Sequence, residues 1–220
     1  MNVLVACEES QRVCTAFRDK GHNAFSCDII DCSGGHPEWH IKQDVIPLLN
    51  GRCEFITVDG TKHKIESKWD LIIAHPPCTY LSNAGARWLY SGGELNQKRF
   101  VLGQKAKEFF MTLYNADCEK ICIENPVPTK IYELPPYSQT IQPYEHGHPF
   151  TKKTCLWLKG LPMLQPSEIV EPIKGKTITL KSGKQRLNCW TMAIKWDKDR
   201  QKNRAKTFEG IAKAMAEQWG

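Results

Sequence analysis

Residues 72–80 read IIAHPPCTY, an apolar run that leads directly into two prolines and a cysteine. The isoleucines before Pro76-Pro77 indicate a buried strand that must stop there, because proline has no N–H to donate to a sheet. This places Cys78 on a rigid turn at the carboxyl edge of the sheet, where open α/β folds bind their ligands. Taken alone, the stretch is also compatible with a buried cysteine next to a surface turn.

A second apolar run, KICI at 120–123, ends in the same way at Glu124-Asn125-Pro126. A thiol and a carboxylate, each held at a strand end by proline, could supply a nucleophile and a proton donor in one cleft. The pair therefore favours a catalytic interpretation of Cys78 and Glu124 over two unrelated turns.

The first half of the chain alternates between strand-like and helix-like patterns. Gly21 is typical of the residue that follows a helix, and Asp59-Gly60 predicts a hairpin turn within 55–68. The alternation predicts an α/β fold with a Rossmann-like, doubly wound, mostly parallel sheet and helices on both faces. Strands are expected at 2–6, 24–27, 69–74 and 120–123, helices at 8–20 and 95–115, and a short helical turn at 45–49.

The pattern changes after Pro126, where prolines become frequent. The expected elements there are a strand at 154–158, extended or β segments at 176–180 and 190–194, and a closing helix at 208–219. The sequence thus predicts a catalytic core at 1–162, a small β-containing appendage at 163–205, and a C-terminal helix at 206–220 that returns to the core.

The composition is that of an ordinary globular protein, with 41% hydrophobic and 25% charged residues in a chain of 220. That length allows one sizeable core. The apolar runs are too short to cross a bilayer, and the N-terminus enters a strand without a signal peptide. We therefore expect a cytoplasmic monomer that binds no membrane.

Ten cysteines and a net charge of +6 add two further expectations. The cysteines are scattered through strands and helices of a chain without an export signal, which favours reduced thiols over disulfides. No paired C-x-x-C motifs accompany the histidines, so we expect no metal, with structural zinc as the lesser alternative. Basic residues concentrate between 152 and 206, which suits either phosphate contacts or a solvated basic face.

The first strand opens into the N-terminus of a helix, which offers free N–H groups to a ligand. The loop at 7–10 reads CEES and lacks a glycine-rich fingerprint, which argues against a bound pyrophosphate. Asp28 ends the second strand, where a carboxylate usually binds ribose hydroxyls, and Asp44 could accept from an adenine amino group. A nucleoside cofactor without a pyrophosphate indicates S-adenosylmethionine, although both aspartates are also typical of turns and caps.

With these features, the chain resembles the DNA cytosine-C5 methyltransferase family, and more narrowly the compact methyltransferase-like proteins of phages. The resemblance covers essentially the whole chain in the family's order, and its specific part is the pair of Pro-Pro-Cys and Glu-Asn. The residues that carry it are 5–10, Asp28, Asp44, 75–78, 124–126, 146–154 and 203–212.

The resemblance implies a mechanism that agrees with the residue chemistry. A thiolate at Cys78 would add to C6 of cytosine while Glu124 protonates or hydrogen-bonds N3, and Lys152 or Lys153 would help to ionise the thiol. In a duplex, the target cytosine would be flipped out of the stack. The resemblance also implies a site for S-adenosylmethionine at Cys7, Glu8, Glu9, Ser10, Asp28, Asp44 and Pro76.

The chain departs from the family in two places. The family's first loop is normally glycine-rich with an aromatic residue, whereas here it reads CEES. Only 163–205 is available for reading bases, which is too short for an elaborate recognition domain. Sequence specificity is therefore expected to be short or relaxed, or the substrate to be other than ordinary duplex DNA.

Two other functions are also considered. The first is a methyltransferase that acts on the amino groups N4 of cytosine or N6 of adenine, or on free nucleotides. The amino-group enzymes carry an acidic or amide residue before Pro-Pro and an aromatic residue after it. In this chain, His75 and Cys78 stand at those two places. The second is a catalytically silent nucleic-acid-binding relative.

Some neighbouring side chains also have two interpretations. His75 is expected to cap the strand end rather than to take part in catalysis. Tyr80 and Trp88 are either core residues or base-stacking residues, and Trp190 and Trp196 either pack in strands or stack on bases.

Overall fold

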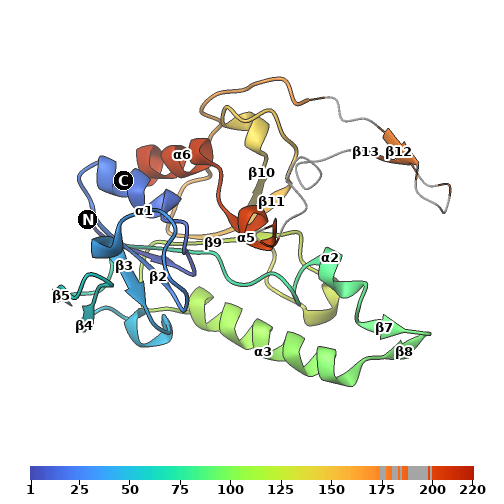
Figure 1. Cartoon of the computed structure of the whole chain (residues 1–220), viewed down its shortest axis with the longest axis horizontal. Coiled ribbons are helices and arrows are strands. Elements are labelled where there is room, and N and C mark those ends of the chain that lie inside the picture. Colours follow the sequence, from blue (N-terminus) through green and yellow to red (C-terminus); the bar gives the residue numbers. More distant parts are fainter. Residues whose placement is uncertain (174–176, 180–182, 184, 188–197, 199) are drawn as a thin grey trace.

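The computed structural model describes residues 1–173, 177–179, 183, 185–187, 198 and 200–220. Its centre is a seven-stranded sheet in the order β10-β11-β9-β6-β1-β2-β3 (Figure 1). The five strands from β9 to β3 are parallel, whereas β11 runs antiparallel to both of its neighbours. The strands are β1 (Asn2–Ala6), β2 (Asn23–Asp28), β3 (His40–Lys42), β6 (Leu71–Ala74), β9 (Ile121–Pro126), β10 (Gln139–Ile141) and β11 (Thr154–Lys159).

The order of the strands reverses between β1 and β6. The chain builds outward from β1 through β2 to β3, then returns to the other side of β1 with β6 and β9. Ala6 pairs with Ala74, and Ala74 pairs with Ile123. The residues that follow these three positions therefore emerge at one edge, at the switch point where doubly wound sheets bind ligands.

Helices cover both faces of the sheet (Figure 1). Helices α1 (Arg12–Asp19) and α6 (Glu209–Trp219) pack on each other and on one face, and α3 (Gln97–Tyr114) covers the other. Alternate residues of β1 enter the two cores, because side chains of a strand point to opposite faces in turn. The predicted Rossmann-like, doubly wound α/β fold is confirmed.

The remaining elements are short and lie around this sheet. Asp59-Gly60 does lie in a hairpin turn, with Gly60 at a φ of 89°. The elements are α2 (Asn83–Ala86), α5 (Arg200–Ala205), the hairpins β4–β5 (Cys53–Ile56 and Lys62–Ile65), β7–β8 (Tyr90–Ser91 and Glu94–Leu95) and β12–β13 (Thr177–Thr179 and Gln185–Leu187), and the 3-10 turns η1 (Pro37–Trp39), η2 (Ile46–Leu48), η3 (Lys130–Tyr132) and η4 (Pro143–Glu145).

Two predicted boundaries are wrong by three residues or more. The first helix begins at Arg12 rather than at residue 8, because Cys7 and Gln11 adopt left-handed φ values of 59° and 58°. Strand β9 continues to Pro126 instead of ending at Ile123, because β11 pairs with it over its whole length. Glu124 therefore lies within a strand, where it pairs with Leu156 of β11, rather than on a turn.

The predicted appendage at 163–205 is described only in part. Of the segment predicted at 176–180, residues 177–179 form β12. The segment predicted at 190–194, with Trp190 and Trp196, lies outside the described residues.

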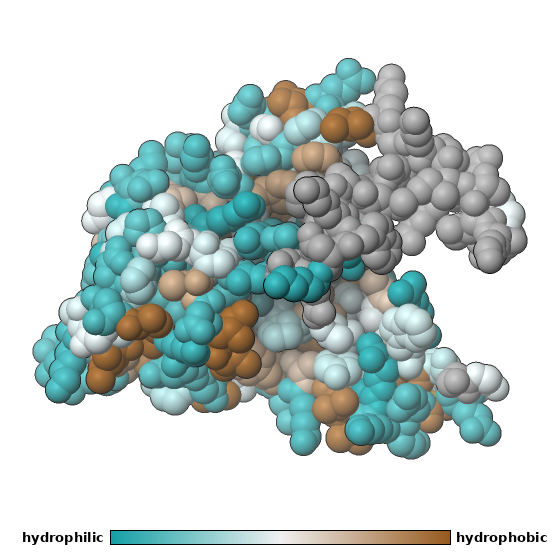
Figure 2. All heavy atoms as spheres, viewed as in Figure 1, coloured by the Kyte–Doolittle hydropathy of each residue, from teal (hydrophilic) through white to brown (hydrophobic). Residues whose placement is uncertain are grey.

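The surface and the cysteines agree with an ordinary globular domain. None of the described helices has both the length and the apolar character needed to cross a bilayer. The face in Figure 2 is mostly hydrophilic, with small separate apolar patches. All nine cysteines in the described part of the chain are free.

Candidate active site at the carboxyl edge of the sheet

A buried histidine–glutamate pair lies at the switch point. His75 follows β6 and Glu124 lies on the neighbouring strand β9, and the distance from His75 Nδ1 to Glu124 Oε2 is 2.9 Å. Both side chains are only 9% exposed. Burial alone would lower the pKa of His75, but the hydrogen bond and the charge of Glu124 outweigh it and raise that pKa above its ordinary value. His75 is thus a partner of the predicted proton donor, beyond the capping role expected for it.

Glu124 is held in its ionised form by its neighbours. Burial would raise its pKa, but the hydrogen bond with His75 and the charge of Lys152 outweigh that effect and lower it. The two opposite pKa shifts favour an arrangement in which a proton on Nδ1 of His75 is donated to the carboxylate of Glu124, in a water-poor environment.

Cys78 lies on a loop that is fixed to the same strand. Asn125 Nδ2 donates to the carbonyl of Pro76 at 2.9 Å, and Ser82 N donates to the carbonyl of Cys78 at 3.1 Å. Burial and the charge of Glu124 raise the pKa of the half-buried thiol, while Lys152 and Arg204 oppose that shift. The charge of Glu124 thus affects the pKa of Cys78, as expected for two groups at one edge of the sheet. The raised pKa favours a protonated sulfur, that is, a thiol.

Of the two predicted lysines, the structure brings only Lys152 to this site. Its charge acts on His75, Cys78 and Glu124, and its Nζ lies 5.7 Å from the ring centroid of Phe208. Lys153 is exposed, and its charge acts instead on Cys155, which packs in the core beneath α3. Arg204 of α5 is a cation near Cys78 that was not predicted individually.

Glu8 extends the site toward α1. Its two carboxylate oxygens accept from Val13 N at 2.7 Å and from Cys14 N at 3.1 Å. This side chain is buried, and its charge contributes to the raised pKa of His75. Glu8 therefore occupies free N–H groups of the helix that were predicted to face a ligand.

Two further acidic residues are Asp28, the last residue of β2, and Asp44, which comes two residues after β3. Burial is the main cause of the raised pKa of Cys7, and the charges of Asp28 and Asp44 raise it further. Each aspartate caps a turn through Oδ1, which accepts from Ile30 N at 3.3 Å for Asp28 and from Ile46 N at 3.0 Å for Asp44. Asp28 also accepts a backbone hydrogen bond from Ile29.

The loop between these groups is fixed by α5 and by the segment after β2. Lys202 Nζ lies 3.2 Å from Glu9 Oε2, and Ser33 N donates to the carbonyl of Glu9 at 2.7 Å. Ser10 is buried in the same loop. A Cβ on Gly34 would lie 2.7 Å from the carbonyl oxygen of Ser10, so only glycine allows this close approach.

Two buried polar atoms at the site have no partner within the described residues: His75 Nε2 and Asn125 Oδ1. Orphaned buried polar atoms are rare in folded proteins and indicate a missing ligand or water. Both belong to residues flanking the loop of Cys78. In the described part of the chain, no group of three or more His, Cys, Asp or Glu side chains could hold a metal ion.

Comparison with known proteins adds little. No protein-family model and no curated protein matches the chain. One solved structure, named as a DNA modification methyltransferase encoded within an E. coli prophage, matches 78% of this chain at 14% identity with a TM-score of 0.45. The chain spans about half of that protein, 52% of its length.

Proposed function

We propose that this protein transfers a methyl group from S-adenosylmethionine to C5 of cytosine in DNA through a covalent adduct with Cys78. The observation that supports this most directly is the arrangement at the switch point. The thiol of Cys78 lies on a fixed loop, and the charge of the buried Glu124 carboxylate raises its pKa. Glu124 is itself hydrogen-bonded to the imidazole of His75.

The proposed reaction begins when the sulfur of Cys78 forms a bond to C6 and loses its proton. The C5–C6 double bond then shifts to C4–C5, the electrons of the C4–N3 double bond move to N3, and N3 gains a proton. C5 thereby becomes nucleophilic and takes the methyl group. Transfer of the methyl group leaves a neutral thioether in place of the sulfonium. A base then removes the C5 proton, the Cys78 sulfur leaves C6 as the C5–C6 double bond re-forms, and N3 gives back the proton that it gained.

The proton for N3 requires a donor other than Glu124 alone, because the lowered pKa of Glu124 keeps it ionised. His75 lies 2.9 Å away with a raised pKa. We therefore assign His75 as the holder of the proton that reaches N3 by way of Glu124.

The acidic end of the site suits a cationic nucleoside. Asp28 would hold the ribose hydroxyls, Asp44 the adenine amino group, and the loop at 7–10 with Pro76 the rest of the cofactor. S-adenosylmethionine, when bound, supplies the methyl group on a positively charged sulfur. The charges of Asp28 and Asp44, which both raise the pKa of Cys7, support this placement.

The domain organisation is proposed on similar grounds. Residues 1–162 would form the catalytic core and 163–205 a reduced recognition region that contacts DNA. The closing helix at 206–220 would return to the core, since α6 packs on α1 and Arg12 Nη1 donates to the carbonyl of Thr207 at 2.7 Å.

Mass spectrometry of nucleosides tests this function. DNA from cells that express the protein should contain 5-methylcytosine, absent from cells that express the Cys78→Ser variant. Appearance of N4-methylcytosine or N6-methyladenine would assign the protein to the amino-group enzymes. Tight DNA binding without any methylated base would identify a silent relative.

Replacing His75 with asparagine is expected to reduce methyl transfer about a hundredfold, because a positioned proton donor contributes roughly 10²–10⁴ in rate. The pKa of His75 is raised, so its proton is held at low pH and is lost as the pH rises through that raised value. The charged groups facing the ring are Glu8, Glu124 and Lys152. The wild-type rate should fall on the alkaline side, and the variant should lack this fall.

Rate–pH profiles under single-turnover conditions measure this effect. His22→Asn is the control, because His22 lies near the opposite end of β1 beside the N-terminus. An unchanged alkaline limb in His75→Asn would remove His75 from the proton pathway.

A further inference from the structure

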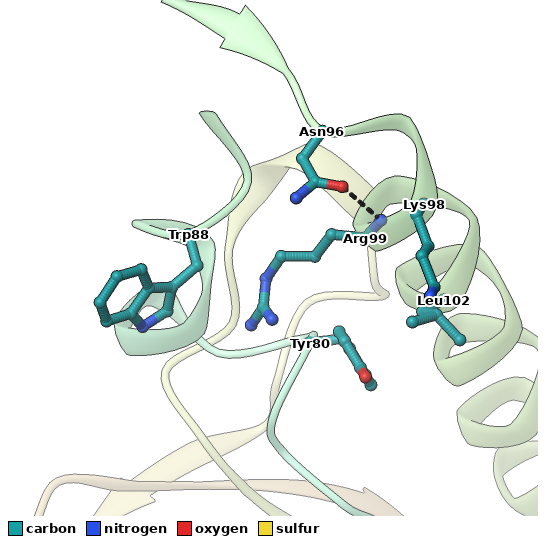
Figure 3. A pocket seen from close by; sticks show the side chains of 6 residues that line it. All are labelled: Tyr80, Trp88, Asn96, Lys98, Arg99 and Leu102. Carbon is teal, nitrogen blue, oxygen red and sulfur yellow. Dashed lines mark hydrogen bonds between the residues drawn. The ribbon is translucent and has the colours of Figure 1, made fainter. Parts of the chain in front are cut away.

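A hollow of about 400 Å³ opens beside the loop that follows Cys78. Its walls come from that loop, from the residues after α2 and from the N-terminal part of α3, which the β7–β8 hairpin precedes (Figure 1). None of the described side chains that line the hollow is acidic. The lining residues are Tyr80, Trp88, Asn96, Lys98, Arg99 and Leu102 (Figure 3).

Arg99 joins this hollow to the nucleophile. In Figure 3 its guanidinium extends between Trp88 and Tyr80. Arg99 Nη2 donates to the carbonyls of Thr79 at 3.1 Å and Gly85 at 3.2 Å, and Thr79 directly follows Cys78. No partner is found for Nη1 or Nε among the described residues. Guanidinium carries five N–H donors, so Arg99 can support the loop and still bind an acceptor in the hollow.

The aromatic side chains are placed for stacking. Trp88 is 60% exposed, which excludes the core role considered for it. The guanidinium of Arg87 lies 4.8 Å from the Trp88 ring centroid, and that of Arg99 lies 4.9 Å from the centroid of Tyr80. Lys98 and Arg87 are both exposed. Aromatic faces interleaved with cations bind unpaired bases and their phosphates.

We propose that this hollow binds an unstacked nucleotide of the substrate strand, adjacent to the cytosine that reaches Cys78. Its base lies against Trp88 and Tyr80, and its phosphate meets Arg99, Lys98 and Arg87. This proposal rests on the proposed function, because it assigns a second contact to the same DNA strand. When a cytosine leaves the stack, the face of the neighbouring base in the same strand becomes exposed. That neighbouring nucleotide is the one that occupies the hollow.

The test is equilibrium binding of a fluorescein-labelled single-stranded oligonucleotide containing one cytosine, followed by anisotropy without cofactor. Trp88→Ala should weaken binding about ten- to a hundredfold, since base–aromatic stacking is worth about 1–3 kcal/mol, and Trp88→Phe should retain most of the affinity. Arg87→Ala with Lys98→Ala should reduce the salt dependence of log Kd by about 0.7 per lost phosphate contact. Lys62→Ala with Lys105→Ala removes the same charge from exposed positions outside the hollow and should change the slope less.

The outcomes separate this proposal from the proposed function. If wild-type protein methylates cytosine and Trp88→Ala binds the oligonucleotide as tightly as wild type, the hollow does not hold a nucleotide. Unchanged DNA binding together with self-association that depends on Trp88 in sedimentation would assign the hollow to a protein contact and would overturn the proposal. Wild-type protein that neither binds nor methylates DNA would overturn both.

Discussion

Cys78→Ser is expected to abolish methyl transfer, with a loss on the order of 10⁴ or more, as for other nucleophile replacements. The sulfur forms the covalent bond in the proposed reaction, and a serine hydroxyl in the same half-buried place would be far less nucleophilic. Because Cys78 is neither fully buried nor part of the core clusters, the variant should fold normally. Transfer of labelled methyl groups to a cytosine oligonucleotide measures the loss.

A 5-fluorocytosine oligonucleotide makes the same prediction visible as a covalent adduct. Fluorine at C5 blocks the last step, so wild-type protein with cofactor should form a complex that survives denaturing electrophoresis, and Cys78→Ser should form none. Cys53→Ser is the matched control, because Cys53 is also a partly buried thiol but lies on the β4–β5 hairpin. Methyl transfer without any adduct would favour an amino-group enzyme.

The central strands could be predicted from the sequence because each is an apolar run of the right length. Strands β1, β6 and β9 are buried on both faces, so they appear as continuous hydrophobic segments. Within the central sheet, the two strands that the sequence did not predict are β3 and β10, which have three residues each and form its outer edges. Edge pairing of so short a segment is decided by tertiary context rather than by a pattern in the chain.

The residues of the site could also be predicted only in part from the sequence. Cys78 and Glu124 could be placed at one edge because parallel strands end together. The bond from His75 to Glu124 joins residues 49 positions apart and depends on the register that pairs Ala74 with Ile123. A clue was present, since His75 directly follows the strand beside β9, but no local pattern specifies register. The different positions of Lys152 and Lys153 likewise depend on how the chain enters β11.

Glu124→Gln should change two properties of the site in opposite directions. Methyl transfer is expected to fall by roughly 10²–10⁴, because glutamine cannot pass a proton from His75 to N3. The thiol should meanwhile become easier to ionise, because the charge of Glu124 raises the pKa of Cys78 and is removed in the variant.

Iodoacetamide labelling of the Cys78 peptide, followed by mass spectrometry across a range of pH, measures the second effect, and single-turnover methyl transfer measures the first. The pH midpoint for labelling should move down in Glu124→Gln and stay unchanged in Glu119→Gln, whose exposed side chain lies just before the other end of β9. A variant that simply loosened the site would also lower the midpoint, because burial raises the same pKa, but it would also speed up labelling of the neighbouring buried thiol Cys122. A lower midpoint at Cys78 combined with lost turnover and unchanged labelling of Cys122 therefore separates the two duties of Glu124.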